Sequence, residues 1–310
     1  MQRRNALQAA ATLLAGASFA SIVNEASATP KTHNSETNRV RFPYLETGER
    51  TTLFYKDWGS GETAVVFVHG WPFHSDMWQY QMFHLASVGI RVIAYDQRGC
   101  GRSTDPGTGY DFDAFADDLA SVIEQLKLRK VVLVGHSIGT GQIVRYLSRH
   151  GSDRVSGIVL LSASLPYIQK SADNPDGVDP EHFEQWRTRV RTDVPAWLDR
   201  ASKSFAPGAS PEMLQWVVRM VDENSIWAMV HANKAEVETD WRAELPNIKA
   251  RTLVIHGDAD RTCHIDTTGR RVAQLIPGAE LKVYAGAAHG LFITHTAALN
   301  DDLLTFVTNK

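Results

Sequence analysis

Three residues with the chemistry of a nucleophile, a base and an acid each follow an apolar run, at widely separated points of the chain. Ser137 lies between Gly135 and Gly139 in the stretch VVLVGHSIGTG. Asp260 ends the stretch TLVIHGDAD, and His289 lies in the small-residue loop AGAAHG. A serine hydroxyl becomes a nucleophile when a histidine takes its proton and a carboxylate orients that histidine. This set of side chains could therefore attack the carbonyl carbon of an ester.

The serine lies where an apolar strand is predicted to turn sharply into a helix. Such a turn forces a strained backbone on its central residue, and the residues two positions away on either side must be small, as Gly135 and Gly139 are. The helix that follows, IGTGQIVRYLSRHG, begins at the serine, and its N-terminus favours negative charge. The motif G-x-S-x-G also arises by chance in Gly-rich proteins, but the strand and helix around it favour the nucleophile.

Two backbone amides are predicted to bind the oxyanion that forms when the serine attacks. In the stretch VFVHGWP, Gly70 allows the chain to turn and would direct the Trp71 N–H toward a substrate carbonyl oxygen. The N–H of Ile138, directly after Ser137, would be the second donor. His69 is expected to brace this loop.

Other residues compete for the same roles. Asp258 lies two positions before Asp260, and on spacing alone either could orient a histidine. His136 precedes the serine but is expected to point away from its hydroxyl and to pack. Four further histidines show no metal-ligand spacing and are interpreted as surface or core residues: His74, His84, His256 and His264. The sequence has no C-x-x-C-H haem site and no G-x-G-x-x-G dinucleotide motif, so no cofactor is expected.

The elements that would position these residues alternate along the chain. Short runs rich in Val, Ile and Leu predict strands at 51–59, 64–70, 91–99, 131–137, 157–164, 252–260 and 281–290. Helical patterns lie between them, as in 111–128, where apolar side chains recur every three or four residues. This alternation predicts a doubly wound, mostly parallel α/β sheet, with functional groups at the carboxyl ends of its strands.

The chain is predicted to consist of an N-terminal signal peptide, a linker, an α/β core and a cap. Residues 29–39 are polar and without periodicity, which indicates a flexible linker. The α/β core is assigned to 40–165 and 247–310. Residues 166–246 begin with the turn-rich stretch NPDGVDP, become helical, and are predicted to form a cap inserted over the sheet. One or two of its tryptophans are expected to line a pocket.

The first 28 residues are predicted to form a secretory signal peptide. Arg3 and Arg4 precede a weakly apolar run from Ala6 to Val23, and Ala26-Ser27-Ala28 is a small-x-small cleavage site. The paired arginines resemble a twin-arginine export signal, although Gln2 stands where a serine is usual. The run is too short and too rich in small residues for a membrane anchor. Export to the periplasm or the medium is expected, without stable membrane insertion after cleavage.

The composition is that of a soluble globular protein. Of 310 residues, 43% are hydrophobic and 22% charged, and the formal net charge is −3. Because no block of like charge is present, neither nucleic acid nor an anionic membrane is expected as a partner.

Five stretches of the chain resemble the α/β-hydrolase superfamily, and within it the cofactor-free haloperoxidase, perhydrolase and arylesterase group. They are HGWP, DQRGCGRS, FADDLASVIEQLKLRKVVLVGHSIG, GDADRTCHIDTTGRR and AAHGLFITH. The resemblance implies an eight-stranded sheet and favours Asp260 over Asp258, so Asp258 is expected to bond backbone within its own loop. By it the triad is Ser137, Asp260 and His289, with Trp71 and Ile138 as the oxyanion donors. The group often has Met and Gly where this chain has Ile138 and Thr140, which bears on the shape of the acyl pocket.

The usual strand order of this fold also separates the only two cysteines. Cys100 and Cys263 follow strands that are four steps apart, about 19 Å at ~4.8 Å per step. A disulfide needs Cα atoms within ~7 Å, so both are predicted to be free thiols.

The resemblance implies a serine hydrolase that acts on small carboxylic esters, with an acyl-enzyme that hydrogen peroxide could also attack. A lactonase or another acyl hydrolase of this fold is the alternative. Epoxide hydrolases and haloalkane dehalogenases share HGWP but need a carboxylate where Ser137 stands. A ligand-binding protein of the same fold, with slow turnover, is a further alternative.

Overall fold

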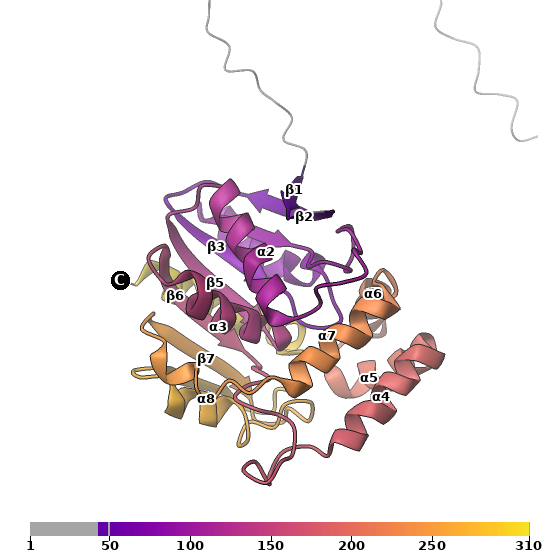
Figure 1. The fold of residues 1–310 in the computed structure, drawn as a ribbon. Coiled ribbons are helices and arrows are strands. Elements are labelled where there is room, and N and C mark those ends of the chain that lie inside the picture. The colour runs from indigo at the N-terminus through magenta and orange to yellow at the C-terminus, as the bar shows by residue number, and fades with distance from the viewer. Residues whose placement is uncertain (1–42, 49, 310) are drawn as a thin grey trace, which may run out of the picture. The chain divides into compact units, whose positions relative to one another are not determined.

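Eight strands form one twisted sheet (Figure 1). The computed structural model describes residues 43–48 and 50–309. In spatial order the strands are β1 (Tyr44–Thr47), β2 (Thr51–Trp58), β4 (Arg91–Tyr95), β3 (Thr63–Val68), β5 (Lys130–His136), β6 (Val155–Leu161), β7 (Thr252–Gly257) and β8 (Glu280–Tyr284). Strand β2 pairs antiparallel with β1 and with β4, and all the other pairs are parallel. The mostly parallel eight-stranded sheet is therefore confirmed.

Strand β1 is the one strand that the apolar runs did not predict. It has four residues, and they alternate between exposed and buried. A short edge strand with one face exposed to solvent has polar residues at alternate positions, so it produces no continuous apolar run.

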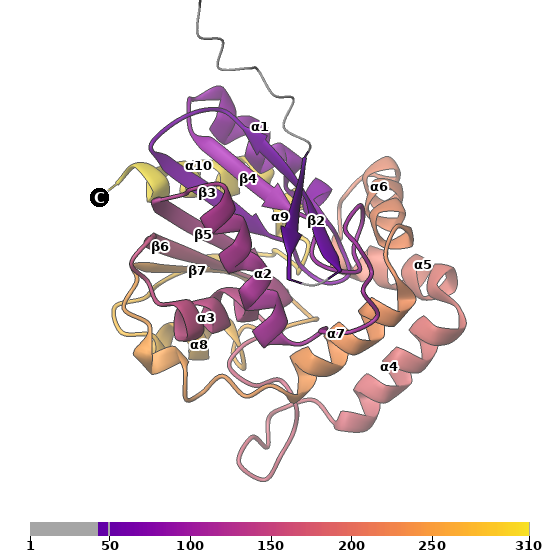
Figure 2. The same cartoon turned by 45° about the horizontal axis from the view of Figure 1, so that its top comes forward.

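Helices cover both faces of the sheet (Figure 2). On one face lie α2 (Phe112–Gln125), α3 (Ile138–His150) and α8 (Gly269–Leu275); on the other lie α1 (Gln79–Ser87), α9 (Leu291–Thr294) and α10 (Thr296–Thr308). Strand β5 shows the consequence: Val131 and Leu133 join the first apolar core, while Val132 and Val134 join the second. Because both sets are buried, the central strands read as nearly continuous apolar runs.

Four helices between β6 and β7 form the cap. They are α4 (Pro180–Thr192), α5 (Val194–Phe205), α6 (Pro211–Asp222) and α7 (Ile226–Glu238), and Figure 1 shows them grouped beside one end of the sheet. The side chain of the residue before each helix accepts a hydrogen bond from a backbone N–H of the first turn: Asp179, Asp193, Ser210 and Ser225. Three of the helices also have Pro in the first turn, which favours initiation there.

Two short 3₁₀ helices, Ser75–Trp78 and Leu245–Asn247, complete the elements of the described residues. Within this part of the chain no helix is both long and apolar enough to span a membrane. The predicted signal peptide and all of the predicted linker, residues 1–39, lie outside the described residues.

The two cysteines are free thiols, as predicted. Cys100 follows β4 and Cys263 follows β7, and β3, β5 and β6 lie between those two strands.

Candidate active site

Ser137 lies at a sharp turn between β5 and α3. Its backbone has φ +51° and ψ −123°, a left-handed conformation that is strained for a residue with a Cβ. The turn brings chain segments into close contact on both sides. A Cβ on Gly135 would lie 2.7 Å from the Gly139 carbonyl oxygen, and one on Gly139 would lie 2.7 Å from the Val68 carbonyl oxygen. The predicted strained turn and its need for both glycines are therefore confirmed.

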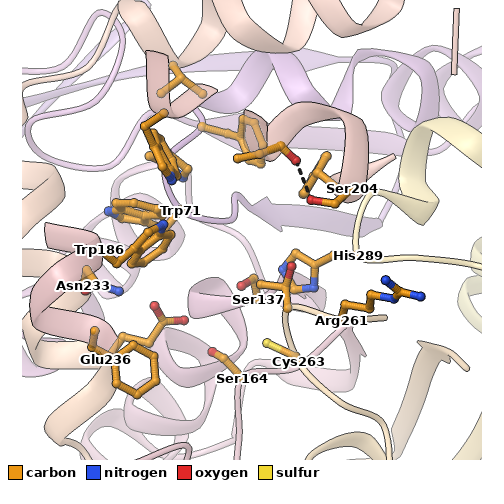
Figure 3. A pocket seen from close by; sticks show the side chains of 18 of the residues that line it. Trp71, Ser137, Ser164, Trp186, Ser204, Asn233, Glu236, Arg261, Cys263 and His289 are labelled. Carbon is orange, nitrogen blue, oxygen red and sulfur yellow. Dashed lines mark hydrogen bonds between the residues drawn. The ribbon is translucent and has the colours of Figure 1, made fainter. Parts of the chain in front are cut away.

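His289 is oriented by Asp260. His289 Nδ1 lies 2.7 Å from Asp260 Oδ2, and both side chains are buried. Since a carboxylate only accepts, Nδ1 carries the proton and donates it in this hydrogen bond. The other ring nitrogen, Nε2, is then free to act as a base. Figure 3 shows His289 next to Ser137, and both residues line the same cavity.

The Asp260 carboxylate is held in place on both of its oxygens. Oδ1 accepts the backbone N–H groups of Thr262 at 2.8 Å and Cys263 at 2.9 Å. His256 Nε2 lies 3.3 Å from Oδ2 while it donates to the Cys263 carbonyl oxygen at 2.8 Å. Burial would raise the pKa of Asp260, but the charge of His289 and the hydrogen bonds from His256 and His289 outweigh it and hold the pKa far below its usual range. Asp260 is therefore ionised at neutral pH. The contact of His256 with this carboxylate is a feature that the sequence did not reveal.

Asp258, the competing aspartate, does not bind the histidine. Its Oδ1 accepts the backbone N–H of Gly286 at 2.6 Å. Gly286 belongs to the loop that carries His289, so Asp258 ties that loop to the end of β7. The interpretation that Asp258 bonds backbone is confirmed, and the partner lies in the neighbouring loop rather than in its own.

The loop after β3 leaves one amide free and is braced by His69. The Gly70 N–H donates to Met77 Sδ at 3.3 Å, whereas the Trp71 N–H has no acceptor among the described residues. The Gln97 N–H donates to His69 Nε2 at 2.9 Å, which leaves His69 Nδ1–H to donate to the Gly70 carbonyl oxygen at 3.0 Å. Burial lowers the pKa of His69 to about 4, so the ring is neutral at neutral pH. The expected bracing role is confirmed.

Ile138 provides the second unpaired amide. It is the first residue of α3, directly after Ser137, and its N–H has no acceptor in the part of the chain that the structure describes. The Thr140 hydroxyl donates to the Ser137 carbonyl oxygen at 2.6 Å and so supports the turn. Neither side chain is among the described residues that line the cavity, so neither forms part of its wall.

His136 packs, as expected. Its Nε2 donates to the His289 carbonyl oxygen at 3.0 Å, and its ring centroid lies 5.3 Å from that of Phe292. Burial lowers the pKa of His136 to about 3, and the charge of His289 adds to this shift. The ring therefore stays neutral while it supports the backbone of His289.

The cavity beside Ser137 has a volume of about 320 Å³, and much of its wall is aromatic. The ring centroid of Trp71 lies 4.6 Å from that of Trp186 and 5.6 Å from that of Trp197, two of the cap tryptophans. The Trp71 indole Nε1–H also donates to the Met229 carbonyl oxygen on α7 at 2.8 Å. The expectation that one or two cap tryptophans line the pocket is confirmed, and the cap is joined to the loop after β3.

A second part of the cavity wall is polar, which the sequence did not reveal. Ser164, Asn233 and Glu236 all line the cavity, and all are buried (Figure 3). Asn233 and Glu236 lie four and seven positions after Met229 on α7, so the three residues share one helix face. In the sequence, Asn233 and Glu236 stand near the polar end of a helical stretch, and nothing in that pattern distinguishes them from residues exposed to solvent.

Comparisons with known proteins place the chain in a family. The family model of the alpha/beta hydrolase fold matches residues 63–296. A non-heme chloroperoxidase from Kitasatospora aureofaciens is 42% identical, covering 86% of this chain and 99% of that protein. A bifunctional esterase/perhydrolase from Acinetobacter calcoaceticus is 36% identical, with coverages of 85% and 99%. The structure of an esterase from Exiguobacterium antarcticum matches with a TM-score of 0.83 at 31% identity, with coverages of 86% and 99%. This chain belongs to the alpha/beta hydrolase family.

Proposed function

We propose that the protein hydrolyses carboxylic esters through an acyl-enzyme on Ser137. The observation that carries the proposal is the 2.7 Å hydrogen bond between Asp260 and His289, which leaves His289 Nε2 as a base in the cavity that also contains Ser137. The similarity to an esterase and to an esterase/perhydrolase supports this assignment.

The reaction begins with the transfer of the Ser137 proton to His289 Nε2 as Oγ attacks the ester carbonyl carbon. Asp260 stabilises the imidazolium, and the N–H groups of Trp71 and Ile138 bind the oxyanion. The intermediate then collapses, the C–O bond to the alcohol breaks, and the leaving oxygen takes the proton from His289. Water repeats the sequence on the acyl group and restores the free serine.

Replacing the nucleophile tests the mechanism. We expect Ser137→Ala to lower kcat for phenyl butyrate by about 10⁶-fold, as the loss of a triad nucleophile typically does, with the fold intact by circular dichroism. A serine-directed fluorophosphonate should label the wild type and not this variant. Ser87→Ala, an exposed serine of α1, is the matched control. Labelling or turnover that persists in Ser137→Ala would contradict the proposal, and an unlabelled, inactive wild type would indicate a ligand-binding protein.

The cavity favours small esters with an apolar group. Its volume, about 320 Å³, lies at the small end of the range for ligand pockets, and its tryptophans offer apolar surface. Phenyl esters from acetate to decanoate, together with lactones, would test this range. Activity should peak among the short acyl chains, and a peak at decanoate or a strong preference for lactones would contradict the assignment.

A second activity, perhydrolysis, is favoured by the similarity to a non-heme chloroperoxidase and to an esterase/perhydrolase. Hydrogen peroxide is a stronger nucleophile than water. Its attack on the acyl-serine breaks the acyl–Oγ bond, forms a peracid and returns the proton to Ser137. The peracid then oxidises bromide to hypobromous acid in solution and is itself reduced to the carboxylic acid.

Bromination of monochlorodimedone in acetate buffer with peroxide tests the second activity. We expect the rate to survive a metal chelator, to disappear in Ser137→Ala, and to fall to background when acetate is replaced by a buffer without a carboxylate. Bromination that continues in Ser137→Ala would show a different chemistry.

A further inference from the structure

A buried carboxyl group faces the cavity and plays no part in the proposed triad. Glu236 of α7 is 8% exposed, lines the same cavity as Ser137, and forms no ion pair with any Lys, Arg or His of the described residues. A buried carboxyl without a cation is costly to a fold. Its position on the cavity wall offers this group to a bound molecule.

The neighbours of Glu236 are arranged as hydrogen-bond donors. Arg187 Nη1 donates to Asn233 Oδ1 at 3.2 Å, so the Asn233 amide has its NH2 group left to donate. Burial raises the pKa of Glu236, and hydrogen bonds from Ser164 and Asn233 together with the charge of His289 only partly offset it. The cluster Ser164, Asn233 and Glu236 therefore presents both donors and acceptors on the cavity wall.

The chemistry of the triad indicates which part of a substrate meets this cluster. The leaving alcohol must take its proton from His289, so the alcohol part lies toward His289 and the acyl part lies away from it. In Figure 3, Glu236 and His289 lie on opposite sides of Ser137. The acyl chain would thus extend toward Glu236.

We infer that Ser164, Asn233 and Glu236 form a subsite for a hydroxyl group on the acyl chain, which makes esters of short hydroxy acids preferred substrates. This inference rests on the proposed ester hydrolysis. A hydroxyl group suits the cluster because it donates to a Glu236 oxygen and accepts from the Asn233 NH2 group. An alkyl chain of equal length would offer no hydrogen-bond partner to the Glu236 carboxyl group or to the Asn233 NH2 group.

Three esters with one leaving group test the inference: phenyl butyrate, phenyl 2-hydroxybutyrate and phenyl 3-hydroxybutyrate. We expect the ratio of kcat/KM for the better hydroxy ester to that for butyrate to fall at least about tenfold in Glu236→Leu. Glu236→Gln, which keeps a donor and an acceptor, should retain most of the ratio. The ratio does not depend on the folded fraction of a preparation, and comparison with the wild type cancels the intrinsic reactivity of each ester.

Glu238→Leu, an exposed glutamate on the same helix, is the matched control and should leave the ratio unchanged. An unchanged ratio in Glu236→Leu, alongside Ser137-dependent hydrolysis, would overturn the inference alone. A stronger preference for phenyl 3-aminobutyrate would show a cation subsite instead and would also overturn it. Absence of Ser137-dependent turnover of every ester would overturn the proposed function itself.

Discussion

At the residue scale, the two aspartates after β7 have similar positions in the sequence and different partners. Asp260 binds the ring of His289, whereas Asp258 binds the backbone of Gly286. We expect Asp260→Asn to lower kcat for phenyl butyrate by about 10⁴-fold near neutral pH. The amide can donate its NH2 group to Nδ1, which favours the wrong tautomer of His289. The measurement is steady-state hydrolysis at saturating ester.

Asp258→Asn is the matched comparison. It should retain kcat within about threefold and lower the free energy of unfolding by about 1 kcal/mol, because one hydrogen bond to a charged acceptor is weakened. If Asp258→Asn lowers kcat more than Asp260→Asn does, the assignment of the acid is wrong.

His136 predicts a pH dependence of stability. Its pKa is lowered to about 3 from the ordinary 6.5, so below pH 6.5 the unfolded chain binds a proton that the folded chain excludes. Its contribution to the free energy of unfolding is complete above pH 6.5 and is lost as the pH falls toward 3. Between pH 7 and pH 5 the wild type should therefore lose about 2 kcal/mol more than His136→Leu, as measured by urea unfolding.

The comparison isolates His136 because other titrating groups are common to both proteins. His69, with its lowered pKa, acts in the same direction, while Glu236, with its raised pKa, acts in the opposite one. Equal losses in the two proteins would mean that His136 binds its proton in the folded state.

At the scale of elements, one residue joins the cap to two loops of the core. Asn224, between α6 and α7, donates through Nδ2 to the Pro72 carbonyl oxygen at 2.6 Å and accepts the Gly101 N–H through Oδ1 at 2.8 Å. We expect Asn224→Ala to lower the free energy of unfolding by about 2–4 kcal/mol, because buried backbone groups lose their partners. Urea unfolding measures the loss. Asn247→Ala, which removes an exposed bond to Ala243, should cost less than about 1 kcal/mol, and equal losses would contradict the joint.

The elements differ in how far the sequence predicts them. Ser137, Asp260 and His289 lie one, three and five positions after the ends of β5, β7 and β8. Because the carboxyl ends of parallel strands meet at one edge of the sheet, their proximity could be predicted. The cap contacts could not. The positions of Glu236 at the cavity and of the Met229 carbonyl oxygen at Trp71 depend on how four helices pack against one another. Local apolar periodicity does not encode that arrangement.

At the scale of the whole molecule, we propose that the N-terminal segment directs export of the protein. We expect the precursor to be cleaved after Ala28, and replacement of Arg3 and Arg4 by Lys to retain it in the cytoplasm if the twin-arginine route is used. N-terminal sequencing of the periplasmic fraction measures the cleavage site. Met1 at the start of the exported protein would exclude cleavage, and periplasmic accumulation of the double-Lys variant would indicate the general secretory route.

Trp71 connects the proposed oxyanion site to the cap. Its backbone N–H is proposed to bind the oxyanion, and its indole N–H is bonded to the Met229 carbonyl oxygen on α7. A substitution that shifts α7 to admit a new acyl chain would therefore also shift the donor on which the rate of bond-breaking depends. Substrate range and turnover therefore depend on the same contact. Variants selected for a larger acyl group should lose kcat on the original ester as well as affinity for it.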